Sequence, residues 1–220
     1  MPEGKGSISN QSIARRPVSD SLTEALVGRR SVRAFVPGSV VPRSVIEASI
    51  VAAGWAPSPH GRQPWRFTVI EDFQRRAALA NAMADDWQRQ LILDGQGAEI
   101  VNIRLEKGKA RLTDASHLVL VNLYLKDLDD YPDEDRQNAE TTMAIQSLGA
   151  AVQNLLLSIH ASGYDAGWMC SPLFCPELVR KELNLSEALQ PHALIPIGVA
   201  AKDPVRRTRR SLQELVVRWD

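Results

Sequence analysis

The spacing of apolar positions divides this chain into helices and strands. Residues 117–125 form an almost unbroken apolar run, HLVLVNLYL, which predicts a strand buried on both faces. Residues 65–71 alternate between apolar and polar types, which predicts a second strand. Residues 139–161 predict a long helix whose apolar positions cover most of its circumference. Such a helix must be buried nearly all round, so we expect it in the core of the fold or at a subunit interface.

Helix and strand signals elsewhere complete the pattern. Ser21 and Ser44 each begin a capping-box sequence that ends on a glutamate three residues later, which predicts helices over 21–28 and 44–54. Further helices are expected over 73–93, 99–111 and 176–183, further strands over 165–169 and 192–199, an acidic loop over 127–135 and a terminal arm over 211–219. This order of elements predicts an α+β layer fold rather than a regular doubly wound sheet.

Composition and charge narrow the class of protein. Residues 1–19 are rich in Ser, Gly, Gln and Arg and predict a disordered tail, while residues 20–220 are expected to form one domain that includes the C-terminal arm. The 26 basic residues balance the 26 acidic ones, which gives no global attraction to nucleic acid or to an anionic membrane. We see neither the apolar core of a signal peptide nor an apolar run of membrane-spanning length. A cytoplasmic protein is therefore expected.

Two clusters of arginine are candidates for ligand binding. The motif GRRSVRAF places Arg29, Arg30, Ser31 and Arg33 just past a helix end, and a second cluster occupies residues 206–210. Guanidinium groups suit a phosphate dianion, because each one can donate two charge-assisted hydrogen bonds. Either cluster alone is more often a solvated basic turn. If the fold brings the two together, they enclose a phosphate group from two sides.

Other chemical motifs are absent from the sequence. No glycine-rich dinucleotide motif follows a strand, the four histidines lack metal-ligand spacing, and DLDDYPDED lacks the glycine of a calcium loop. Cys170 and Cys175 are not spaced as a redox pair. We therefore expect no metal and no catalytic side chain, and an enzyme of this kind would rely on the reactivity of a cofactor.

Four motifs, in order, resemble those of the nitroreductase family. They are RRSVRAF, APSPHGRQPWRF, GAAVQNLLLSIHASGYDAGWMCSPLF and RRSLQELV, and the resemblance covers residues 20–217. It implies a three-layer α+β fold with a central, mainly antiparallel sheet flanked by helices. It also implies an intertwined homodimer that binds flavin mononucleotide (FMN) at the subunit interface, with the chemistry at N5 of the flavin.

A narrower resemblance is to the C-terminal reductase domain of FbiB, which acts in the biosynthesis of the deazaflavin coenzyme F-420. It is carried by RRSVR, the Pro-x-Pro-His loop, Tyr131-Pro132-Asp133 and LVRKELNL. Many nitroreductases have Asn where this chain has Gly61, which also favours the FbiB-like branch. This resemblance implies an FMN-dependent reductase of a dehydro precursor of F-420, without the glutamate-ligase domain.

The resemblance also implies which residues bind ligands. The expected cofactor-binding residues are Arg29, Arg30, Ser31, Arg33, Ser58, Pro59, His60, Met169, Cys170, Ser171, Leu173, Arg207 and Arg209. The weaker candidates for substrate contact are Arg62, Arg66, Trp87, Arg89 and Gln90, of which the arginines are about as well explained as surface residues. In this view the first arginine motif and the C-terminal arginines hold the phosphate, and the loop at Ser58 forms a wall of the flavin site.

Three functions stay open at this point. The first is reduction of a dehydro precursor of F-420 through FMN, and the second is a general NAD(P)H-dependent reduction of nitro compounds or quinones. The third is non-catalytic binding of flavin or F-420. The sequence does not identify the hydride donor, which could be NADH, NADPH or a deazaflavin.

Overall fold

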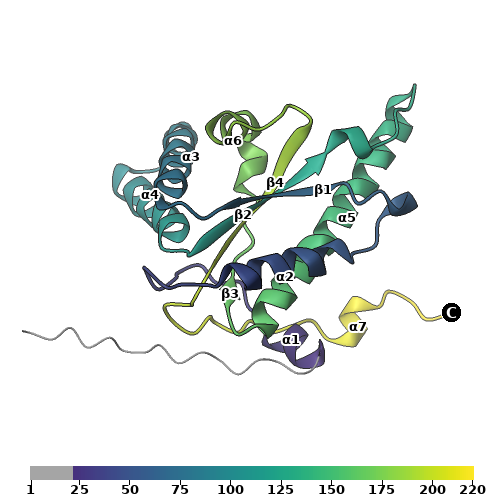
Figure 1. The fold of residues 1–220 in the computed structure, drawn as a ribbon, viewed down its shortest axis with the longest axis horizontal. Helices are drawn as coiled ribbons and strands as arrows, with labels where there is room; N and C mark the ends of the chain where they lie inside the picture. Colours follow the sequence, from purple (N-terminus) through teal and green to yellow (C-terminus); the bar gives the residue numbers. More distant parts are fainter. Residues whose placement is uncertain (1–21) are drawn as a thin grey trace, which may run out of the picture.

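The computed structural model of the protein describes residues 22–220, in which strands are interspersed with single helices and pairs of helices (Figure 1). The helices are α1 (Leu22–Gly28), α2 (Arg43–Gly54), α3 (Phe73–Leu93), α4 (Ala98–Thr113), α5 (Glu134–Ala161), α6 (Pro176–Leu183) and α7 (Leu212–Leu215). The strands are β1 (Trp65–Ile70), β2 (His117–Tyr124), β3 (Asp165–Ala166) and β4 (Leu189–Gly198). Short 3-10 turns lie at Pro59–Gly61, Leu125–Asp127 and Ser171–Phe174.

The strands form one sheet between two layers of helices. Their order is β1-β2-β4-β3, and every neighbouring pair is antiparallel. Helices α3, α4 and α6 lie on one side of the sheet, and α1, α2 and α5 lie on the other (Figure 1). This arrangement confirms the predicted α+β class, with a mainly antiparallel sheet flanked by helices.

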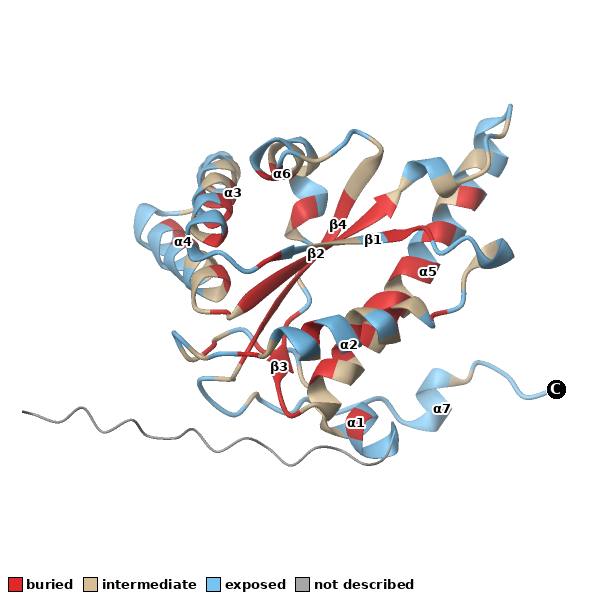
Figure 2. Cartoon of the chain, in the orientation of Figure 1, coloured by how far each residue is buried: buried red, intermediate tan, exposed pale blue. Residues whose placement is uncertain are grey.

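Strand β2 is buried on both faces, as its apolar run predicts. Val119 and Val121 pack into the cluster formed with α2 and α5, whereas Leu118 and Leu120 pack into the cluster formed with α3 and α6. The alternation follows from the period of two in a strand, which sends successive side chains to opposite faces. Burial therefore runs along the whole centre of the sheet (Figure 2).

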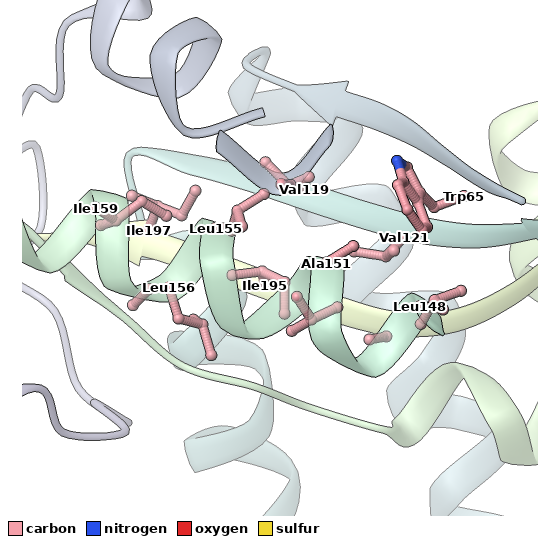
Figure 3. Packing of buried hydrophobic residues seen from close by; sticks show 14 of the residues in the cluster. Trp65, Val119, Val121, Leu148, Ala151, Leu155, Leu156, Ile159, Ile195 and Ile197 are labelled. Carbon is pink, nitrogen blue, oxygen red and sulfur yellow. The ribbon is translucent and has the colours of Figure 1, made fainter. Parts of the chain in front are cut away.

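Helix α5 is the core helix of one layer. Leu148, Leu155 and Ile159 are at most 3% exposed and pack on β2 and β4 (Figure 3). By length and composition alone α5 could cross a membrane, but 44% of its most apolar stretch is buried inside this fold. Its apolar circumference is not fully covered within the chain, because Met143 and Ile145 remain 37% and 40% exposed.

Several predicted boundaries were wrong. Helix α5 begins at Glu134, because the Asp133 side chain caps it by accepting a hydrogen bond from the Arg136 N–H, so the acidic loop is shorter than expected. Helix α2 begins at Arg43 after Pro42, without a side-chain cap, so the capping box at Ser44 does not form. Strand β3 is shorter than predicted, and β4 begins earlier. The predicted tail and the capping residue Ser21 lie outside the described residues.

The segment after α1 is held against the edge of the sheet. Ser31 forms a bridge with Ala166 of β3, and the Val32 N–H donates to the Ala166 carbonyl at 3.0 Å. Gly167 allows this close approach, because a Cβ there would lie 2.4 Å from the Val32 carbonyl oxygen. Val32 is buried, so its neighbours along the extended segment face outward. This pairing fixes where the first arginine motif lies.

We expect Gly167→Ala to lower the free energy of unfolding by about 1–3 kcal/mol, because the added methyl group must displace backbone rather than a flexible side chain. Gly97→Ala is the matched control, since no atom lies within 4 Å of a Cβ at that position. Urea denaturation of both variants measures the difference. Equal stabilities would contradict a tight approach at Gly167.

Candidate functional site

A cavity of about 650 Å³ lies where the two arginine clusters meet. The residues that line it come from three parts of the chain: the segment after α1, the C-terminal half of α4 and the segment after β4. They are Arg29, Arg30, Ser31, Val32, Arg33, Ala34, Lys107, Ala110, Arg111, Asp114, Lys202, Asp203, Pro204, Val205, Arg207 and Arg209. The fold therefore brings together the clusters that the sequence presents about 175 residues apart.

The cavity is strongly positive. Eight of the residues that line it are basic and two are acidic. Within residues 22–220, none of these eight has an ion pair with a carboxylate. Burial lowers the pKa of the Arg29 guanidinium, and the nearby charges of Arg30 and Arg209 lower it further. These positive charges repel one another, so an anion in the cavity would stabilise them.

Several buried guanidinium donors of the cavity have no partner within residues 22–220. These are Nε and Nη1 of Arg29 and Nε of Arg30, while Arg30 Nη1 donates to the Arg29 carbonyl at 2.6 Å. A buried charged donor without a partner costs more than the roughly 1–3 kcal/mol of a neutral one. A phosphate group satisfies such donors with charge-assisted hydrogen bonds. The residues present in this cavity therefore fit the phosphate end of a nucleotide or flavin cofactor.

The loop at Ser58 has an unusual backbone. His60, Gly61 and Gln63 have φ values of 54°, 66° and 52°, in the left-handed region that costs most residues about 1–2 kcal/mol. The Ser58 hydroxyl accepts a hydrogen bond from the Gln63 N–H at 3.0 Å, which fixes the turn. A non-glycine residue held in this region often marks a functional loop.

Within one chain, this loop lies far from the arginine cavity. It follows α2 and lies beyond the end of that helix opposite to β3, where the arginine segment is paired (Figure 1). The 12 residues of α2 span about 18 Å. The chain by itself therefore does not bring Ser58, Pro59 and His60 together with the arginine cluster.

Residues 169–173 form a fixed wall next to β4. Met169 exchanges two hydrogen bonds with Leu194, at 3.0 and 2.8 Å. The Leu173 N–H donates to the Cys170 carbonyl, so this N–H is not free to bind a ligand. Within residues 22–220, the Ser171 hydroxyl is buried without a partner, and the N–H groups of Cys170 and Ser171 donate to no acceptor. These three groups are thus polar groups without a hydrogen-bond partner in the described part of the chain.

The candidate substrate residues do not gather in one place. Arg62 binds the Asp129 carboxylate at 2.6 and 2.7 Å, and Arg66 binds Asp127 at 2.7 Å. On α3, across the sheet from α2, Asp86 accepts hydrogen bonds from both Arg89 and Gln90. The Trp87 ring lies against Gly108 of α4. All three candidate arginines therefore already have a carboxylate partner.

Sequence reasoning missed the basic residues of α4 and Lys202. Lys107 and Arg111 are four residues apart and share one helix face, which is a signal that the sequence does contain. The sequence alone does not show that this face of α4 lies beside the arginine motif, so the shared helix face could not be recognised as part of the site. Among residues 22–220, no group of His, Cys, Asp and Glu could hold a metal ion.

The protein resembles several flavoproteins of known structure. A BluB-like flavoprotein from Clostridium difficile 630 superposes with a TM-score of 0.75 at 24% identity, covering 92% of this chain and 100% of that one. A nitroreductase in complex with FMN from Desulfovibrio desulfuricans gives a TM-score of 0.70 at 25% identity, covering 92% of this chain and 98% of that one.

Sequence relatives include iodotyrosine deiodinases. That of Haliscomenobacter hydrossis is 29% identical over 187 residues, which is 79% of this chain and 77% of the relative. That of Drosophila melanogaster is 26% identical over 183 residues, which is 80% of this chain and 61% of the relative. The model of the nitroreductase family matches residues 26–199. Because that match spans well over half of the chain and the fold agrees with it, the protein belongs to the nitroreductase family.

Proposed function

We propose that this chain binds FMN through its arginine cavity and acts as a flavin-dependent oxidoreductase of small molecules. The observation that carries the proposal is the set of buried guanidinium donors of Arg29 and Arg30 that have no partner in the described part of the chain. Two further findings support it: the family of the chain and the FMN complex of the Desulfovibrio desulfuricans relative.

Arg29, Arg30, Ser31 and Arg209 would hold the phosphate. Their donors approach the cavity from two segments, so the phosphate would be enclosed rather than bound on one side. Because Ser31 is bridged to Ala166 of the sheet, the donors of the first arginine motif are already positioned, and binding orders little additional chain there. Arg33 and Arg207 line the same cavity and would complete its positive charge.

The bound flavin would supply the redox chemistry at N5 of its ring. The chain would contribute the Ser171 hydroxyl and the N–H groups of Cys170 and Ser171 as donors beside the ring. The rigid loop at His60 would exclude water from the other side. No side chain is required to act as a nucleophile or a general base.

The site would be completed by a second copy of the chain. The Ser58 loop lies away from the arginine cavity of its own chain, so only a partner subunit can bring it to the flavin. Exposed apolar side chains in two regions support this arrangement: Trp55 beside the loop is 85% exposed, and Leu212 and Leu215 of the C-terminal arm are more than 60% exposed. An intertwined homodimer would bury these side chains.

Reduction of a small organic acceptor is the activity we favour, and the comparisons suggest two acceptor classes. Membership of the nitroreductase family suggests nitro compounds and quinones as acceptors, and similarity to the iodotyrosine deiodinases suggests halogenated tyrosines. The dehydro precursor of F-420 remains a third acceptor, but the carboxylate partners of Arg62, Arg66 and Arg89 weigh against those residues holding its charged tail. Turnover assays with all three acceptors distinguish them. A cytoplasmic location remains a prediction.

We expect Arg29→Ala and Arg209→Ala each to weaken FMN binding about ten- to a hundredfold, because each removes a charge-assisted contact worth about 1.5–3 kcal/mol. Fluorescence titration of the apo-protein with FMN measures the change. Arg104→Ala is the control, because that exposed residue of α4 lies outside the cavity. Unchanged affinity in both cavity variants would place the phosphate elsewhere.

We expect the protein to sediment as a dimer, with FMN bound only in that form. Trp55→Glu should dissociate the dimer and reduce flavin content together, since a charge at a buried interface position is strongly disfavoured. Analytical ultracentrifugation with detection of flavin absorbance follows both quantities. A stable monomer with full FMN occupancy would exclude an interface site.

Cys170→Ser and Cys175→Ser should leave reduction of the bound flavin unchanged. Burial raises the pKa of the Cys175 thiol, and the nearby Asp86 carboxylate raises it further, so this thiol is protonated at neutral pH and is a poor nucleophile. Stopped-flow absorbance at the flavin band measures the rate. A collapse of the rate in either variant, with FMN still bound, would demonstrate a role for a thiol.

A further inference from the structure

The cavity holds more positive charge than one phosphate needs. With eight basic and two acidic residues along its walls, it carries a net charge of six positive. A phosphate monoester brings at most about two negative charges. If FMN binds as proposed above, several cations of the same cavity remain without an anion. A diphosphate in place of the monoester would not change this balance, because its two bridging phosphates carry about one negative charge each.

The cations form two groups at different walls of the cavity. Arg29 interacts with the charges of Arg30 and Arg209. Arg111 of α4 instead interacts with the charge of Arg33, and its Nε donates to the Arg33 carbonyl at 3.4 Å. The charges that act on Arg29 therefore come from Arg30 and Arg209, whereas Arg33 and Arg111 act on each other, so positive charge extends along the cavity from the segment after α1 to α4.

Lys107 strengthens the second group. It lies one helical turn before Arg111 on α4, so both side chains face the same wall. Neither residue has a carboxylate partner within residues 22–220. Two cationic side chains from one helix and one from the facing segment line this part of the cavity, and cations of this kind suit the oxygens of a phosphate monoester.

We propose that Arg33, Lys107 and Arg111 form a second phosphate subsite, which binds a phosphate monoester carried by the hydride donor. The inference rests on the proposed function, because a flavin reductase needs such a donor. NADPH and NADH differ only in the 2′-phosphate, and an arginine is the usual partner of that group. The subsite therefore selects NADPH over NADH.

The test compares the two donors on the FMN-loaded protein. Arg111→Ala should weaken NADPH binding about ten- to a hundredfold and leave NADH binding unchanged, whereas Arg111→Lys should retain part of the preference. Arg104→Ala on the same helix is the control, because Arg104 does not line the cavity. Binding is measured from the donor concentration at half-maximal rate of flavin reduction and, independently, from the melting temperature with NADP⁺ or NAD⁺.

A second experiment adds inorganic phosphate to the apo-protein. It tests the second subsite without FMN, so its result does not depend on the proposed function. Phosphate should raise the melting temperature of the wild type and of Arg104→Ala more than that of Arg111→Ala. If phosphate acts through Arg111 while the protein does not discriminate between NADPH and NADH, the donor assignment is overturned. If Arg111→Ala changes neither response, the second subsite is overturned. A protein that binds no FMN refutes the proposed function, and the phosphate arm still tests the subsite.

Discussion

Burial of strand β2 on both faces is the constraint on which the rest of the structure depends. Leu118 and Leu120 require a layer of helices on one side, and Val119 and Val121 require a layer on the other. Neither layer can be removed without exposing apolar surface at a cost of roughly 25 cal/mol per Å². The three-layer fold follows, and α5 is the core helix of one of its helical layers. The edge of this sheet at β3 is then free to pair with another segment of the chain.

The segment that pairs there determines the chemistry. Val32 and Phe35 anchor it in the core, while Arg29, Arg30 and Arg33 line the cavity. Holding these cations together without carboxylate ion pairs is unfavourable in the isolated chain, because like charges repel and buried donors lose water. The rigid sheet supports this arrangement, and an anionic ligand would reverse the penalty. The unliganded site lowers the stability of the fold, and relief of this repulsion by a bound phosphate adds to the affinity for phosphate.

The sequence predicted most of the fold because both periodicities are strong. The run at residues 117–125 identified the central strand, and the long apolar helix identified α5. It also predicted that two arginine clusters could meet. It failed at helix boundaries, where one side chain decides the result: Asp133 caps α5, which begins five residues before the predicted start. It also could not predict that Lys107 and Arg111 face the cavity, since this depends on how α4 packs against segments distant in sequence.

The central claim is that the arginine cavity recognises the phosphate of FMN. The most direct measurement is calorimetric titration of the apo-protein with FMN and with riboflavin, which is the same flavin without the phosphate. Several charge-assisted hydrogen bonds, each worth about 1.5–3 kcal/mol, predict that FMN binds at least about a hundredfold more tightly than riboflavin, and that the difference shrinks as salt is added. Equal affinity for the two flavins would contradict the account.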